Sequence, residues 1–80
     1  MLRISKDTKL QPAAVIERAA RFFGKGGEGL DESERSACCI SFQGVGGYLT
    51  VSIADENQHR TVDIETREFE YQAKRFLGKL

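Results

Sequence analysis

The chain has few of the residues on which metal sites and active sites depend. Its 80 residues include no Trp, one Pro, one His and two Cys, and 12 basic residues balance 12 acidic ones. One His and two Cys are too few ligands for a zinc site within one chain. A net charge of zero argues against strong non-specific binding to nucleic acids. We therefore expect no metal, no cofactor and no catalytic residues.

Long apolar runs are also missing from the sequence. None is long enough to form the core of a signal peptide or to span a bilayer. The sequence therefore predicts a cytoplasmic protein with reduced thiols and no membrane partner. A chain of this length makes one domain, residues 1–80, and buries only about 60% of its unfolded surface, so we expect no large enclosed pocket.

The most informative pattern is the alternation of apolar and polar residues between positions 37 and 66. Such a period of two is typical of strands that bury one face of an antiparallel sheet. β-branched residues, which suit a half-buried strand, are frequent in the second half of the pattern. The alternation predicts three strands, over residues 36–43, 47–55 and 58–66.

Two turn signals set how these strands pair. The run Gly44-Val45-Gly46-Gly47 predicts the first reversal, because glycine accepts the positive φ of a tight turn. Glu56-Asn57 predicts the second reversal. These turns place Ile40 opposite Val51 and Val51 opposite Val62. A slip of one residue would send the apolar side chains to the polar face, so we expect this register to be well determined.

An amphipathic helix is predicted on each side of this strand region. Residues 12–24 begin with Pro12, which suits the first turn of a helix, and their apolar residues recur at helical spacing. Residues 67–79 carry a second apolar stripe, with Thr66 as the predicted N-cap. The Gly-rich and acidic segment 25–35 is predicted to be a flexible loop.

One apolar sheet face and two amphipathic helices predict an α+β two-layer sandwich. Its order is α-β-β-β-α, with an antiparallel meander and both helices on one face. The alternation of Leu2 and Ile4 with polar neighbours leaves open a fourth, N-terminal strand. The other sheet face stays open, and together with the following corner it carries the candidate interaction residues Tyr48, Thr50, Ser52, Thr61, Asp63, Glu65 and Arg67.

The two cysteines are adjacent in the sequence. Neighbouring strand residues point to opposite faces, so the sulfurs should diverge, and a vicinal disulfide would need a distorted peptide. Cys38 is predicted to be a small core residue, and Cys39 an accessible thiol whose reactivity is left open. Cys39 and His59 should lie on the outer strands, on the order of 10 Å apart, which is too far for catalysis together with Asp63.

A glycine motif, Gly24-Lys25-Gly26-Gly27-Glu28-Gly29, matches the pattern G-x-G-x-x-G. The dinucleotide fingerprint requires a strand before this motif and a helix N-terminus after it. Here a predicted helix precedes the motif and acidic residues follow it. The motif therefore predicts the end of a helix and a hinge, and no nucleotide site.

Two longer stretches are Gly46-Gly47-Tyr48-Leu49-Thr50-Val51 and Val62-Asp63-Ile64-Glu65-Thr66-Arg67-Glu68-Phe69. With Phe22-Phe23-Gly24, they resemble a group of small, uncharacterised prokaryotic α+β proteins. In that group the third strand passes through a V-D-V-E-T-R-E-like segment into a helix with an aromatic residue. The resemblance implies no activity, but it implies that the junction Glu65-Thr66-Arg67-Glu68 does more than connect two elements.

The sequence predicts a small, non-enzymatic protein-interaction module. It would bind a partner protein or a second copy of itself through the open polar face or through an edge of the sheet. One alternative is a binder of small molecules or lipids, with a cleft between helices and sheet. The other is weak nucleic-acid binding through residues 1–25, which carry a net charge of +4. Tyr48 and Arg67 are the first candidates for alanine substitution, because aromatic and Arg side chains often dominate binding energy.

Overall fold

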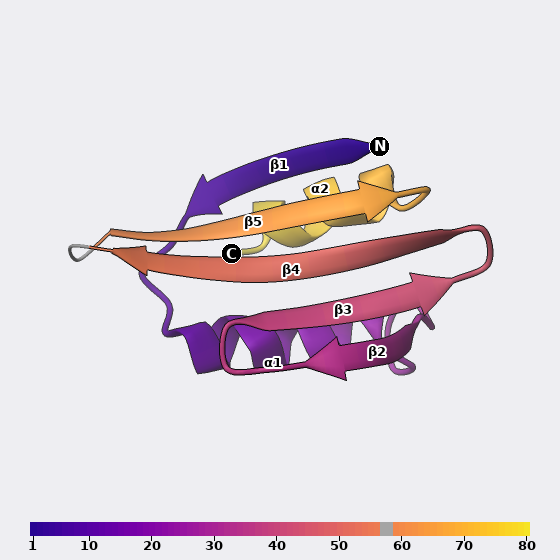
Figure 1. Cartoon of the computed structure of the whole chain (residues 1–80), viewed down its shortest axis with the longest axis horizontal. Helices are drawn as coiled ribbons and strands as arrows, with labels where there is room; N and C mark the ends of the chain where they lie inside the picture. The colour runs from indigo at the N-terminus through magenta and orange to yellow at the C-terminus, as the bar shows by residue number, and fades with distance from the viewer. Residues whose placement is uncertain (57–58) are drawn as a thin grey trace.

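Residues 1–56 and 59–80 are described by a computed structural model of the chain. The element order is β1 (Leu2–Asp7), α1 (Pro12–Phe23), β2 (Asp31–Arg35), β3 (Cys39–Gly44), β4 (Gly47–Glu56), β5 (His59–Arg67) and α2 (Glu70–Gly78). The strands form one antiparallel sheet in the order β1-β5-β4-β3-β2. Both helices lie on the same side of this sheet, behind it in Figure 1. The chain is therefore an α+β protein with two layers.

The apolar core fills the space between the helix layer and the sheet. α1 contacts β3 and β4, whereas α2 contacts β1 and β5. The ring of Phe23 lies at the centre of this core, 5.1 Å from the ring of Phe76 and 5.6 Å from that of Phe42. The apolar residues of the central strands, which are buried against the helices, are Ile40, Phe42, Leu49, Val51, Ile53, Val62 and Ile64.

The first hairpin has the predicted register, but the second is shifted by two residues. Ile40 lies opposite Val51 as predicted. Val51, however, lies opposite Ile64, and Val62 lies opposite Ile53, so the predicted pairing of Val51 with Val62 is wrong. Each described residue of β5 lies opposite the β4 residue two positions beyond its predicted partner. Because the shift is even, the apolar side chains stay on the buried face.

The predicted second turn at Glu56-Asn57 falls partly outside the described residues, since Asn57 and Gln58 are not among them. The last described pair of this hairpin is Glu56 with His59. In the first hairpin, Gly44 pairs with Gly47, and Gly46 has φ +81°. The first reversal therefore uses the positive φ that favours glycine at this position.

Two further strands extend the predicted meander at its edges. β1 pairs with β5, which resolves the open question of an N-terminal strand. β2 pairs with β3, so the prediction of a loop over all of 25–35 is wrong for Asp31–Arg35. Every residue of β2 is exposed. The strand is held by backbone pairing and has no apolar alternation that would reveal it in the sequence.

The junction between β5 and α2 also differs from the prediction. Thr66 is not a helix cap, because it belongs to β5 and is fully buried. Its hydroxyl donates a hydrogen bond of 2.8 Å to the carbonyl oxygen of Tyr48. The chain then turns at Glu68, which has φ +81°, and α2 begins only at Glu70. A buried hydroxyl with a strand partner is satisfied within the sheet and is not free to cap a helix.

Candidate functional site

One face of the sheet is not covered by the helices, and we call it the open face. It is turned towards the viewer in Figure 1. All seven candidate interaction residues project from this face, because they alternate with the buried residues of β4 and β5. The cross-strand pairs that place them there are Tyr48 with Arg67, Thr50 with Glu65, Ser52 with Asp63, and Ala54 with Thr61.

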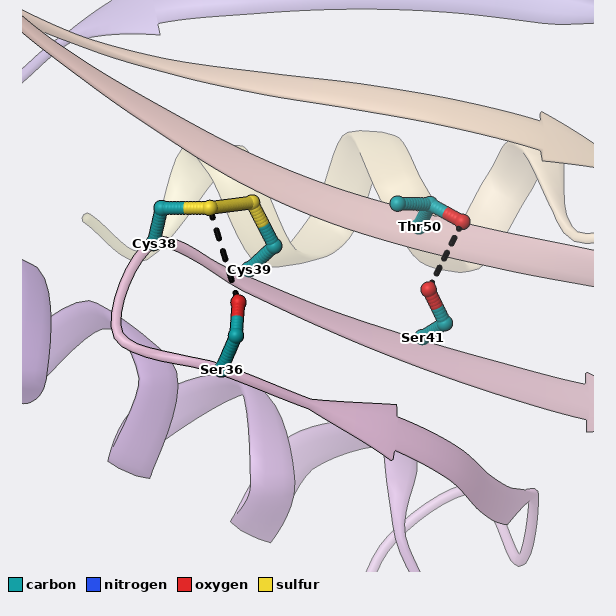
Figure 2. The surroundings of a disulfide bond; sticks show 5 residues. All are labelled: Ser36, Cys38, Cys39, Ser41 and Thr50. Carbon is teal, nitrogen blue, oxygen red and sulfur yellow. Dashed lines mark hydrogen bonds between the residues drawn. A yellow bond between two sulfur atoms is a disulfide. The ribbon is translucent and has the colours of Figure 1, made fainter.

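Two hydrogen bonds order the middle of the open face. The hydroxyl of Tyr48 donates to Oε2 of Glu65 over 2.8 Å. The hydroxyls of Ser41 and Thr50 lie 3.1 Å apart, from neighbouring strands, as Figure 2 shows. The predicted pairing of Val51 with Val62 would place Tyr48 directly opposite Glu65, whereas the observed contact between Tyr48 and Glu65 is diagonal across β4 and β5. Diagonal neighbours are within reach of long and aromatic side chains, which explains why the contact survives the shift.

The hydrogen bond to Glu65, partial burial and the negative charge of Glu65 raise the pKa of Tyr48 above 10.0, and the charge of Arg67 opposes this shift. In a Tyr71→Phe variant Tyr48 is the only tyrosine, so the ultraviolet absorbance of phenolate reports on it alone. We expect a midpoint above pH 10, which Glu65→Ala should lower. Since the folded pKa is raised, this contact stabilises the fold below about pH 10 and is lost as the pH rises through the folded pKa. A midpoint at or below pH 10 would contradict the geometry.

Charged side chains of β1 join the open face at its edge. The guanidinium of Arg3 forms an ion pair with Asp63, with Nη2 and Oδ2 2.9 Å apart. The hydrogen bond to Asp63 and its charge raise the pKa of Arg3. Asp7 accepts a hydrogen bond of 3.2 Å from the hydroxyl of Thr61, and its Oδ1 lies 3.2 Å from Nε2 of His59. These contacts tie β1 to β5 through side chains as well as through the backbone.

The open face is acidic. Cross-strand pairing places on it the basic residues Arg3 and Arg67 and the acidic residues Asp7, Asp31, Glu34, Glu56, Asp63 and Glu65. With His neutral, two basic against six acidic residues give this face a net charge of −4. The whole chain has a net charge of zero, so the remaining residues carry +4. The molecule is therefore polarised between an acidic sheet face and a basic remainder.

Sequence reasoning missed this polarisation because half of the acidic residues come from the edges. Asp7 and its partner Thr61 join the face only if β1 is a strand. Asp31 and Glu34 join it only because β2 pairs with β3. The weak alternation in residues 2–5 was a usable signal for β1. No comparable signal marked β2.

Cys38 and Cys39 form a disulfide, shown in Figure 2. The predictions of reduced thiols, of a buried Cys38 and of divergent sulfurs are therefore wrong. β3 begins only at Cys39, and Cys38 lies in a bend before it, so the alternation of a strand does not apply to Cys38. Cys38 is exposed and Cys39 is half-buried.

The structure gives no support to a catalytic Cys-His-Asp group. The sulfur of Cys39 is bonded to Cys38. His59 contacts Asp7, whereas Asp63 contacts Arg3. Within residues 1–56 and 59–80, no three potential metal ligands cluster. Neither helix of the described chain combines the length and the apolar character needed to cross a bilayer.

Two hollows lie at the edges of the sheet, and another lies between the end of α1 and the edge strand β2. One of about 570 Å³ lies where β1 ends and β5 begins, and it includes Arg60 and Leu80. The guanidinium of Arg60 donates to the carbonyl oxygen of Leu10 over 2.7 Å and forms an ion pair with Asp55. Arg60 is therefore engaged in holding the chain after β1, which is a structural use.

In comparisons with known proteins, no family model, no curated protein and no solved structure matches this chain.

Proposed function

We propose that the protein is a small, non-enzymatic interaction module whose open face binds a basic surface of a partner protein. The observation that carries this proposal is the net charge of −4 on the sheet face opposite the two helices. Complementary charge steers partners together and selects between them. An acidic face also disfavours nucleic acid at this surface, because phosphates would be repelled.

Charge makes a second copy of the chain a poor partner for this face. Two open faces brought together would each carry −4, and like charges across an interface are costly. Two copies of the chain could also pair edge to edge through β2, but the structure of this strand disfavours it. Its register shifts between Glu32 and Glu34, and the strand is acidic. Bulges and charges of this kind are common protections of an edge strand. We therefore favour a different protein over a homodimer.

The candidate residues have distinct roles in this proposal. Half-buried Tyr48 offers an aromatic ring held by Glu65, and its cross-strand partner Arg67 is exposed. Rigid aromatic rings and planar guanidinium groups are enriched among the residues that dominate binding energy. Arg67 can donate to backbone carbonyls of the partner. The hydroxyls of Thr50, Ser52 and Thr61 supply further polar contacts.

A lysine decapeptide is a defined probe of the acidic face. The open-face variant Asp31→Asn, Glu34→Gln and Glu65→Gln removes three charges while keeping an acceptor for Tyr48. Exposed charge pairs contribute about 0.2–1 kcal/mol each, so we expect calorimetry at low salt to show binding weakened by about tenfold. Added salt should weaken the wild-type interaction as well.

The matched control is Glu17→Gln, Glu28→Gln and Glu70→Gln, which changes the net charge equally but away from the open face. We expect this control to bind the peptide within about twofold of wild type. If both variants lost affinity equally, the interaction would depend on net charge alone and the proposal would be wrong. A duplex DNA that bound more tightly than the peptide would also contradict it and would favour the basic N-terminal region.

A further inference from the structure

The Cys38–Cys39 disulfide lies at the surface, where the connection from β2 enters β3 (Figure 2). A disulfide stabilises a fold mainly by restricting the unfolded chain, and this effect grows with the length of the loop that it closes. Neighbouring residues close the shortest loop available. A contribution to stability therefore does not account for the bond.

Backbone hydrogen bonds hold this part of the chain independently of the sulfurs. The N–H of Ser36 donates to the carbonyl oxygen of Cys39 over 2.8 Å, and the N–H of Ile53 donates to that of Cys38 over 2.9 Å. Cys39 also pairs with Ser52 in the β3–β4 ladder. The sulfurs can therefore separate while the ends of β2 and β3 keep their places.

We propose that Cys38 and Cys39 form a redox-active pair that undergoes reversible, stoichiometric thiol–disulfide exchange with small dithiols and with cysteine thiols of other proteins. Exchange requires access for an attacking thiolate, and the pair is exposed at Cys38 and only half-buried at Cys39. After reduction the two thiols remain on adjacent residues. Their reoxidation is then intramolecular, which favours closure.

The exchange proceeds in two displacements. A thiolate of an external dithiol attacks Sγ of Cys39 and forms a mixed disulfide, while the bond between the two cysteines breaks and Cys38 leaves as a thiolate. The hydroxyl of Ser36, whose Oγ lies 3.5 Å from Sγ of Cys38, is placed to donate a hydrogen bond to this thiolate. The second thiol of the dithiol then displaces Cys39. The dithiol is oxidised to a disulfide, the pair gains two electrons, and both cysteines take up the protons released.

The test is reduction of the full folded chain by dithiothreitol, followed by alkylation and mass spectrometry. We expect both cysteines to be alkylated after reduction, neither before it, and neither again once the dithiothreitol has been removed and oxidised glutathione has been added. Amide NMR signals should change only near residues 36–39 and 52–53, and Tm should move by less than about 5 °C. A pair that resists reduction until the chain is denatured, or a sheet that unfolds on reduction, would overturn the proposal.

A second variant tests the assignment of the leaving sulfur. Ser36→Ala should slow reduction by about threefold, since it removes the donor to the departing thiolate. Ser41→Ala is the matched control, because its hydroxyl bonds to Thr50 and lies away from the disulfide in Figure 2. We expect the control to be reduced at the wild-type rate. If Ser36→Ala were also reduced at that rate, Cys38 would not be the sulfur that leaves.

Discussion

Phe23→Ala is expected to lower the free energy of unfolding by about 3–5 kcal/mol, because it deletes a fully buried ring and leaves a cavity. The ring lies within 5.6 Å of the rings of Phe22, Phe42 and Phe76, so it connects both helices to the sheet. The free energy of unfolding of a domain of this size is about 4–12 kcal/mol, so the variant should be only marginally stable. Urea denaturation followed by circular dichroism measures the change.

The control for this prediction is Tyr71→Ala. Tyr71 lies on α2 and is 70% exposed, so this variant removes an aromatic side chain that is not part of the core. We expect its free energy of unfolding to change by no more than about 0.5 kcal/mol. If the free energy of unfolding of Phe23→Ala lay within about 1 kcal/mol of the wild-type value, the two helices would not share the packed core described above.

Gly47→Ala is expected to lower the free energy of unfolding by about 1–3 kcal/mol. A Cβ added at Gly47 would overlap the carbonyl oxygen of Arg67 and approach the side chain of Glu68 within 2.7 Å. Backbone atoms cannot yield as the end of a flexible side chain can. The start of β4 or the corner after β5 would therefore have to move. Thermal or urea denaturation would measure the resulting loss of stability.

Gly78→Ala is the matched comparison, since a Cβ there meets nothing within 4 Å and the residue lies in α2. Alanine favours helix over glycine, so this variant should be neutral or more stable by up to about 1 kcal/mol. Equal effects at Gly47 and Gly78 would show that β4 and the corner at Glu68 are not in the close contact described.

The alternation between positions 37 and 66 was enough to predict which side chains share a face, but not the full register. A period of two distinguishes the two faces, and an even shift leaves both faces unchanged. Val51 therefore finds an apolar partner whether it faces Val62 or Ile64. Only the turn decides between the two registers, and a turn signal as short as Glu56-Asn57 does not fix its position to one residue.

Two other features could not be predicted from the alternation. β2 has the residues Asp31-Glu32-Ser33-Glu34-Arg35, with no apolar residue, so its pairing with β3 depends on the strand beside it. The vicinal disulfide depends on where β3 begins, because strand alternation separates the sulfurs only if both cysteines lie within the strand. A boundary error of a few residues was therefore enough to reverse the conclusion about Cys38.

The candidate site, too, could be predicted from the sequence only in part. Its central residues on β4 and β5 follow from alternation alone, since each is flanked by buried residues. The acidic character of the face does not follow from it, because Asp7, Asp31 and Glu34 join the face only through the pairing of the edge strands. Pairing between strands that are distant in the sequence brings these charges together. The net charge of the whole chain is zero and does not indicate that one face is acidic.

The most direct test of the acidic open face is an NMR titration of the ¹⁵N-labelled chain with the lysine decapeptide at low salt. We expect the largest shifts at amides of β4 and β5, between Tyr48 and Ser52 and between Thr61 and Arg67, with little change along α1. Shifts that gathered instead around Glu17 on α1, Glu28 in the segment after α1, and Glu70 on α2 would contradict the proposal that the open face is the binding surface.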